Sequence, residues 1–577
     1  MSEETVDRSL LARGHWSVRD VSPVSISAIL TLAVFVVIFL ALRPAHGIDD
    51  ADITMVYARN VAAGHGYVYT PGGERVEGST SLAWTLVCAL VFASGSSSMI
   101  PLFAIVILFT FTACFAGLEL ARRAGGTTIA ILSSALLMAA SPSYFAWTLG
   151  TLMDTALWSA CIVVALLQSL SITARAWPWR LSLAIVALLL ARPEGVAIAG
   201  AILLVAFISH ASSGIGIRAS WRAILPPLVV TVACFTALLA CRVAYFGYPM
   251  PNTYYAKVGA DAIYTATHGG VYLVKFLLRN PVNLLAAFAA VHVLATDGRA
   301  ALARMSHPNR AKDGEEGITR LSLSIVFACG LALPFVEGED HFVGSRMMQP
   351  FVPVSCALVG SLAAKWLVAE KSRHRRIVSV ALLGSAAFAV WVDFVLTTAP
   401  ELKRQARIAS TGRIMGRLLA ERLGQAMPMP TVGVACAGGI AFAYPGRVMD
   451  LLGLNWVAMA HGTRDRRGRP GHAAFAKDVF WSESSTLVLP QIFQSPPRNA
   501  CDLSSKWLHS VFRGLFSSSR FRREYTGISM STPEGNLATF VRRDWLATHP
   551  MPEVQSLDWP VGMGERCGSE HLPRRDD

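Results

Sequence analysis

Asp49 and Asp50 are adjacent carboxylates that directly follow the first long apolar run of the chain. Carboxylates beside a bilayer are costly unless they face water, a metal or a polar substrate. A carboxylate placed there can take the proton of a hydroxyl group as a general base. A structural role is the alternative, because either aspartate could cap a helix over residues 51–63. The pair therefore predicts either a base at the membrane surface or a helix start.

Further polar residues are predicted to lie on the same side of the membrane. They are Tyr57 and Arg59 beside the aspartates, then Asp154, Arg192, Glu194, Asn252, Lys257, Asp340, His341 and Arg346. Simpler roles exist: an Arg192–Glu194 ion pair, a helix cap at Asp154 and a turn at Asn252. Together these acids and cations predict a site for a phosphate-bearing polar ligand. A divalent metal on the aspartates stays open, and no His/Cys ligand spacing supports a zinc site.

These residues must be positioned by membrane helices. The chain has 577 residues, of which 53% are hydrophobic and 15% charged, and its mean hydropathy is +0.45. Long charge-free blocks such as Val24–Leu42, Pro101–Leu118 and Ile377–Val392 are long enough to cross a bilayer. The net charge of +13 lies in short loops, which is typical of cytoplasmic loops rather than of nucleic-acid binding.

Basic loops alternate along the chain and predict eleven spans with a cytoplasmic N-terminus. The spans are expected near 23–42, 99–120, 127–146, 152–172, 180–192, 194–210, 224–245, 280–297, 320–336, 349–369 and 376–397. Residues 43–98 form an outer-face loop, in which Ser81–Ser94 is too short to cross and is predicted as an interfacial helix. The polar stretch Asp297–Thr319 is predicted as a mobile cytoplasmic loop.

Residues 1–397 are thus predicted to form an all-α polytopic membrane core, and residues 398–577 a soluble extracytoplasmic α/β domain. Thr431–Cys436 and Ser485–Leu489 are expected to be strands, with a turn at Gly438 and Gly439. If the domain is exported, one disulfide can form among Cys436, Cys501 and Cys567, with one thiol left over.

Six stretches resemble one family of membrane enzymes. They are Asp49–Trp84, Thr148–Trp158, ARPEG at Ala191–Gly195, YFGYPMPNTYYAK at Tyr245–Lys257, EDHFVGSRMMQP at Glu339–Pro350 and Gly446–Gly462. They resemble the GT-C superfamily of glycosyltransferases, and within it the terminal arabinofuranosyltransferases of mycobacterial type. The chain departs from that pattern by carrying Asp154 in place of Glu and Ser81 in place of Asn.

The resemblance implies a GT-C fold in the plasma membrane with the C-terminal domain outside. It implies inverting transfer of a sugar from a polyprenyl-phosphate donor to a hydroxyl of an envelope glycan, lipid or glycoprotein. Asp49 or Asp50 would be the base, and Arg192, Lys257, His341 and Arg346 would stabilise the departing phosphate. The alternatives are a transporter or flippase for a lipid-linked glycan, and an inactive scaffold. No internal repeat of the transporter kind is present.

Overall fold

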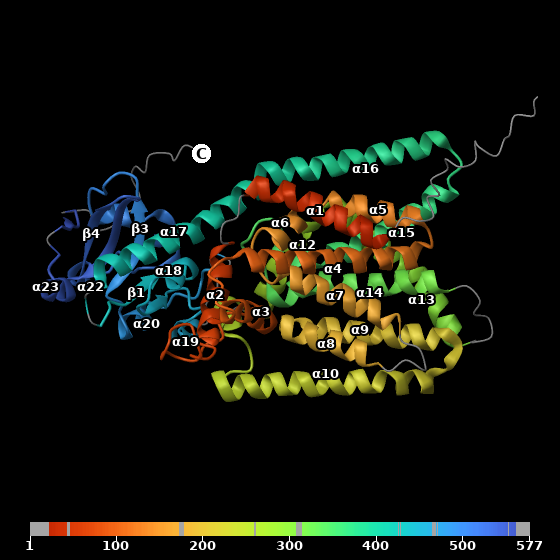
Figure 1. Ribbon diagram of the computed structural model, residues 1–577, viewed down its shortest axis with the longest axis horizontal. Helices are drawn as coiled ribbons and strands as arrows, with labels where there is room; N and C mark the ends of the chain where they lie inside the picture. The colour runs from red at the N-terminus through yellow and green to blue at the C-terminus, as the bar shows by residue number, and fades with distance from the viewer. Residues whose placement is uncertain are drawn as a thin grey trace, which may run out of the picture.

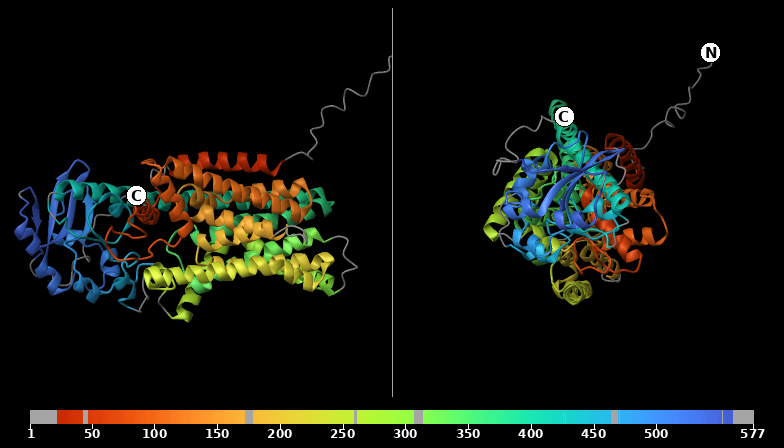
Figure 2. Two further views of the ribbon diagram at one scale, coloured as in Figure 1. Left: turned by 60° about the horizontal axis from the view of Figure 1, so that its bottom comes forward. Right: turned by 90° about the vertical axis from the view of Figure 1, so that its left-hand side faces the viewer.

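The computed structural model describes residues 22–42, 47–171, 178–258, 261–306, 314–424, 426, 428–463, 469, 471–551 and 553–560. Helices form an elongated bundle, and a six-stranded sheet sits at one end of its long axis (Figure 1). The left view of Figure 2 shows the same arrangement, and the right view looks along the long axis from the sheet end. Cys567 and the basic residues of the predicted cytoplasmic N-terminus lie outside the described residues.

The bundle consists mainly of long apolar helices. They are α1 (Pro23–Leu42), α4 (Ile100–Gly125), α5 (Thr128–Ala139), α6 (Pro142–Leu149), α7 (Thr155–Ser169), α8 (Trp179–Ala191), α9 (Gly195–His210), α10 (Ile217–Phe246), α12 (Ala262–Arg279), α13 (Pro281–Ser306), α14 (Glu315–Glu337), α15 (Val352–Ala369) and α16 (Arg373–Asp393). Short π segments follow α9 (Ala211–Ile215) and α16 (Phe394–Thr398), and a 3₁₀ turn (Arg346–Phe351) precedes α15. The chain is therefore a multi-pass membrane protein, as predicted.

The predicted number of eleven spans is not confirmed. Within the described ranges, eight helical segments are long and apolar enough to cross a membrane, and the α5–α6 pair, bent by 71°, would be a ninth. The two other predicted spans correspond to α7 and α8, of only 15 and 13 residues. Helix α7 is buried along almost its whole length. Helix α7 is therefore surrounded by other helices. The length of a helix packed inside protein need not match the thickness of the bilayer.

Two features of the bundle differ from the prediction. Helix α12 was not predicted, because His268, Lys275 and Arg279 interrupt its apolar residues. The predicted mobile loop 297–319 is wrong at both ends, since α13 continues to Ser306 and α14 begins at Glu315. Arg320 holds these helix ends together, with its Nε 2.9 Å from Asp297 Oδ2. The middle of that loop, residues 307–313, lies outside the described residues.

The loop between α1 and α4 contains two helices that carry the candidate base. Helix α2 (Asp49–Ala62) begins with the aspartates, and α3 (Leu82–Ala93), of 12 residues, lies within the predicted interfacial helix Ser81–Ser94. The Ser81 hydroxyl caps α3 by accepting a hydrogen bond from the Trp84 amide. The Trp84 indole donates to Leu152 O at 3.0 Å, which fixes α3 against the start of α7.

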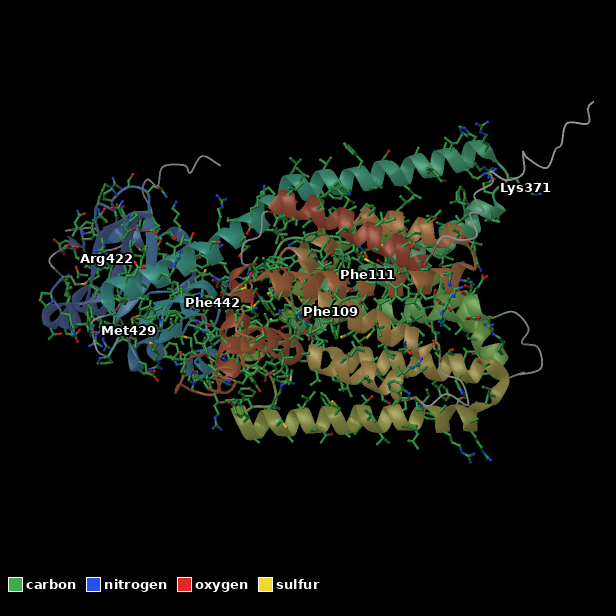
Figure 3. All side chains as sticks on the ribbon, in the orientation of Figure 1. Phe109, Phe111, Lys371, Arg422, Met429 and Phe442 are labelled. Atoms are coloured by element: carbon green, nitrogen blue, oxygen red, sulfur yellow. The ribbon has the colours of Figure 1, made fainter. Side chains whose placement is uncertain are left out.

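One continuous helical run connects the bundle with the sheet. Helix α16 passes through the π segment into α17 (Ala399–Leu423), so that Arg373–Leu423 spans 51 residues. In Figure 3, Lys371 lies at the far end of the bundle, whereas Arg422 and Met429 lie in the sheet part. The predicted boundary between residues 397 and 398 therefore falls inside a helical run.

The C-terminal part is an α/β domain built on one mixed sheet. Its strands are β1 (Val432–Val434), β2 (Val448–Asp450), β3 (Leu487–Phe493), β4 (Tyr525–Thr532), β5 (Gly535–Arg542) and β6 (Gln555–Leu557), in the order β2-β1-β3-β5-β4-β6. Strand β1 pairs in parallel with β2 and β3, and the remaining pairs are antiparallel. Strands β1 and β3 lie where strands were predicted. The predicted glycine turn is wrong, because Gly438 opens helix α18 (Gly438–Ala443).

Helices cover both faces of this sheet. The short ones are α19 (Val457–His461), α20 (Lys477–Ser482), η6 (Ala500–Leu503), α21 (Lys506–Val511), α22 (Ser519–Glu524) and α23 (Arg543–Thr548). On one face, Leu418 and Leu419 of α17 pack in a cluster with the β1 valines and with Ile53 of α2. On the other, Phe480, Phe512 and Phe521 pack against Phe540. Cys501 is disulfide-bonded and Cys436 is a free thiol.

Candidate active site

The aspartate pair lies in the first turn of α2, and neither side chain caps the helix. Ile48 is the N-cap residue, and it makes no side-chain cap hydrogen bond. Gly47 has a φ of +80°, and a Cβ there would lie 2.4 Å from Thr151 O. The Ile48 amide donates to the same carbonyl at 3.3 Å. Glycine at 47 therefore lets α2 begin directly against the loop before α7.

Asp49 joins α2 to the C-terminal part. Its two carboxylate oxygens accept hydrogen bonds from the Gly438 and Gly439 amides at 3.0 and 2.9 Å. Burial raises the pKa of Asp49 to about 7, although these two amides oppose the increase. A Cβ on Gly438 would lie 1.9 Å from Asp49 O, so this approach also requires glycine. Both oxygens of Asp49 are thus engaged across the contact between the two parts.

Asp49 is expected to make stability depend on pH. Its carboxyl has a raised pKa in the folded chain, so the folded state binds more protons than the unfolded state between pH 4 and 7. Stability should therefore fall as pH rises through that window, by at most about 1.4 kcal/mol per pH unit. Melting curves at pH 5 and 7.5 test this for the purified chain and for Asp49→Asn. The stability of Asp49→Asn should depend less on pH than that of the unchanged chain. An equal pH dependence in both proteins would contradict the raised pKa of Asp49.

Asp50 has the opposite electrostatic environment. Its side chain is 23% exposed, and its Oδ2 lies 3.4 Å from Arg346 Nη1. Burial opposes ionisation of Asp50, but the charges of Lys257 and Arg346 outweigh it and hold its pKa below the usual value. Asp50 is therefore a carboxylate at neutral pH, held between two cations.

Arg346 connects Asp50 with the loop Glu339–Arg346. Its Nε lies 2.9 Å from Asp340 Oδ2, so one guanidinium bridges two carboxylates. Ser345, directly before it, has a φ of 52°, a conformation that costs energy in a residue other than glycine. The guanidinium carbon also lies 4.4 Å from the ring centre of Phe342. Asp340 and Phe342 of this loop and Asp50 of α2 thus hold Arg346 in place.

His341 is neutral in this arrangement. Burial lowers the pKa of His341 to about 4, although Asp340 opposes the decrease. The His341 Nδ1 lies 3.6 Å from Asp340 Oδ1, and its ring centre lies 4.6 Å from that of His472. A neutral imidazole offers a hydrogen bond but no positive charge to a phosphate. Within the ranges that the structure describes, Lys257 forms no ion pair and is the cation that remains available.

Arg192 lies in a separate ion-pair cluster. Its Nη2 is 3.1 Å from Glu194 Oε1, and its Nη1 is 3.2 Å from Asp154 Oδ2. The pKa of Glu194 stays below its usual value because the attraction of Arg192 outweighs burial. Asp154 occupies the N-cap position of α7 without a side-chain cap bond. Arg192 and Glu194 therefore form the ion pair that was the simpler expectation. The carboxylates of Glu194 and Asp154 together neutralise the Arg192 guanidinium.

Tyr57, Arg59 and Asn252 contact the C-terminal part, and none of them lines a pocket that contains Asp50 or Lys257. The Tyr57 hydroxyl donates to Asn455 Oδ1 at 3.1 Å, and Arg59 Nη1 donates to Phe442 O at 2.6 Å. Asn252 Nδ2 donates to Gly453 O at 2.7 Å. In Figure 3, Phe442 lies where the bundle and the sheet part meet. These three side chains hold the two parts together.

A pocket of about 490 Å³ opens at this junction. The predicted residues Asp49, Asp50, Lys257 and His341 line it together with Gln405, Cys436, Asp450 and His472. The last four were not predicted as site residues. Cys436 follows β1 and Asp450 ends β2, and the carboxyl ends of parallel strands are common ligand sites. Burial raises the pKa of Asp450 to about 6, against hydrogen bonds from the amides of Leu452 and Asn455.

The described residues do not form a metal-ligand set. Within the described ranges, no group of three or more His, Cys, Asp or Glu side chains is placed to hold a metal ion. Asp50 and Asp340 have Arg346 as their counter-ion instead. The arrangement can accept a proton on Asp50 and can stabilise an anion beside Lys257 and Arg346.

Comparisons with known proteins identify the fold. No protein-family model matches the chain, and no curated protein matches it. Its structure is similar to that of the archaeal oligosaccharyltransferase AglB from Archaeoglobus fulgidus, solved with an inhibitory peptide and a dolichol-phosphate. The TM-score is 0.51 at 12% identity, over 94% of this chain and 75% of AglB. The chain thus has the GT-C fold that the sequence predicted.

Proposed function

We propose that this chain is a membrane glycosyltransferase that moves a sugar from a polyprenyl-phosphate donor to a hydroxyl of an envelope glycan, lipid or glycoprotein. Arabinofuranose is the sugar that the sequence resemblance favours. The observation that carries the proposal is the carboxylate of Asp50, which lines the pocket together with Lys257 and is paired with Arg346. A base next to two cations suits a reaction that removes a proton and releases a phosphate.

The reaction is a single displacement. The acceptor oxygen attacks C1 of the donor sugar while the bond from C1 to the phosphate oxygen breaks. Asp50 takes the proton of the attacking hydroxyl, and the polyprenyl phosphate leaves with the electron pair. Lys257 and the guanidinium of Arg346 stabilise its charge. Because the acceptor attacks opposite the leaving group, the configuration at C1 inverts.

Lys257 is assigned to the leaving phosphate because it is the cation of this pocket without an ion-pair partner among the described residues. Lys257→Met keeps much of the side-chain length and removes the charge. Its KM for the donor is expected to rise about tenfold or more, because one charge-assisted hydrogen bond is lost. Initial rates at varied donor concentration test this, with Lys275→Met on α12 as the exposed control. A higher KM for the acceptor alone would contradict the assignment.

The site is proposed to face the outer side of the plasma membrane, with the N-terminus in the cytoplasm. Residues 398–577 would then form the extracytoplasmic domain, continuous with the core through α17. The exposed basic cluster around Lys371 at the opposite end supports this orientation.

Cysteine labelling tests the orientation. Ser97 follows α3 and is exposed, so Ser97→Cys should react with a membrane-impermeant maleimide in intact cells. Lys371→Cys should react only after permeabilisation and is the matched control. The signal of the unchanged chain, whose Cys436 is exposed in the pocket, gives the background. The opposite pattern would place the site in the cytoplasm and would contradict the proposed donor side.

The activity itself is tested with purified protein. It is incubated with polyprenyl-phosphate sugars, including the arabinofuranosyl donor, and with envelope glycans, and release of polyprenyl phosphate is followed. Acceptor-dependent release that disappears in Asp50→Asn is the expected result. The alternative, a transporter or flippase for a lipid-linked glycan, predicts donor movement across vesicles without any release.

A further inference from the structure

A second pocket of about 450 Å³ lies beside the first. Its polar lining comes from Lys257, from Tyr264, Thr265 and His268 of α12, and from Glu337 and Glu339 at the end of α14. Lys257 and Gly471 line both pockets, so the second one opens next to Asp50.

The charges of the second pocket do not favour an anion. Two carboxyl groups, those of Glu337 and Glu339, face one cation, Lys257. Because Glu337 shares a hydrogen bond with Glu194, the lining has no excess of positive charge that would hold a phosphate. Carboxyl and hydroxyl groups can instead bond to the hydroxyls of a neutral polyol, since a hydroxyl both donates and accepts.

Two further observations point to a ligand with hydroxyl groups. The Glu337 carboxyl shares a hydrogen bond with Glu194, and its buried Oε1 atom makes no other within the part of the chain that the structure describes. A carboxyl oxygen can accept a further hydrogen bond, so a ligand hydroxyl would bond there. The Tyr264 and His268 rings stack with their centres 3.9 Å apart. The Nδ1 of His268 donates to Tyr264 O at 2.9 Å, which leaves Nε2 of a neutral ring as an acceptor.

We propose that this second pocket is a saccharide subsite that holds the sugar next to the reacting unit of the acceptor glycan. The assignment rests on the proposed glycosyl transfer at Asp50. A glycan whose terminal hydroxyl reaches Asp50 would pass Lys257 and place its preceding sugar between α12 and the end of α14. The enzyme would then distinguish acceptors by two sugar units instead of one.

Binding of soluble trisaccharides tests the subsite directly. Arabinofuranosyl, galactofuranosyl and mannosyl trisaccharides are added to the full-length protein in detergent, and saturation transfer to their protons is measured by NMR. At least one should bind, and Glu339→Gln and His268→Ala should each weaken it about tenfold, the loss of one hydrogen bond. Thr267→Ala, an exposed neighbour on α12 that does not line the pocket, should bind as the unchanged chain does.

Kinetics separate this subsite from the transfer reaction. Both variants should raise the acceptor KM while the donor KM stays within about twofold. Weaker donor binding with unchanged trisaccharide binding would overturn the proposal and assign the pocket to the lipid donor. Absence of binding by all three trisaccharides, or binding that both variants leave unchanged, would also overturn it. Asp50→Asn should keep trisaccharide binding, so an active Asp50→Asn with normal binding would refute the base and leave the subsite standing.

Discussion

Asp50→Asn is expected to lower turnover about 100-fold or more while the protein folds normally. The amide has nearly the same size and can still accept a hydrogen bond from Arg346, but it cannot take the proton of the acceptor hydroxyl. The pKa of Asp50 lies below its usual value, so the unchanged enzyme should keep an ionised base well into the acidic range. Release of polyprenyl phosphate at saturating donor and acceptor measures the loss.

Asp261→Asn is the matched control for this experiment. Asp261 caps α12 by accepting from the Tyr264 amide at 2.7 Å, and asparagine keeps that ability. Its turnover should match that of the unchanged chain. If Asp50→Asn keeps near-normal turnover and Asp49→Asn does not, Asp49 is the base, despite the two amides that engage its oxygens.

Arg346→Met is expected to lower turnover by about 100-fold or more for two reasons. The leaving phosphate loses a donor that is fixed in place before the reaction, a loss that usually costs about 10² to 10³ in rate. Asp50 and Asp340 also lose their shared counter-ion, so the pKa of Asp50 should rise. The acidic limb of the pH–rate profile should therefore move to higher pH.

Arg346→Lys separates charge from geometry. A lysine ammonium is a point charge and cannot reproduce the planar guanidinium that bridges the two carboxylates. Its turnover should fall at least about tenfold although the charge is kept. Arg422→Met, on the partly exposed surface of the sheet part, is the control and should leave both turnover and the pH profile unchanged. A pH profile for Arg346→Met like that of the unchanged chain would refute the role of Arg346 in ionising Asp50.

Much of the membrane core could be predicted because lipid imposes a length and an apolar composition on each helix. Helices α1, α4 and α10 lie where that rule places them. The rule fails for α7, which is buried among other helices, and for α12, whose polar residues line a pocket. Strands β1 and β3 could be predicted from their apolar residues. The antiparallel β4–β5 hairpin could not, because polar and apolar residues alternate too little along it.

The candidate site could be located from sequence but not resolved into roles. Asp50, Lys257, His341 and Arg346 were predicted to converge, and the structure brings them together. Arg192 was predicted to stabilise the same phosphate, yet Asp154, 38 positions away, pairs with it. Which cation remains unpaired depends on such distant partners. The same holds for Asp49, because nothing local to the aspartate pair indicates that two distant amides engage one member and leave the other in the pocket.

The bonds between Asp49 and the glycine amides also bear on how the protein is made. Gly438 and Gly439 lie 389 and 390 positions after Asp49, so the ribosome completes α2 long before it reaches Gly438. A nascent chain that ends before that glycine already contains Asp50, Lys257 and Arg346, but it lacks Asp450 and His472 of the pocket wall. Throughout this interval the carboxylate of Asp49 lacks both of these amide partners. The proposed site is therefore complete only after the last quarter of the chain has been synthesised.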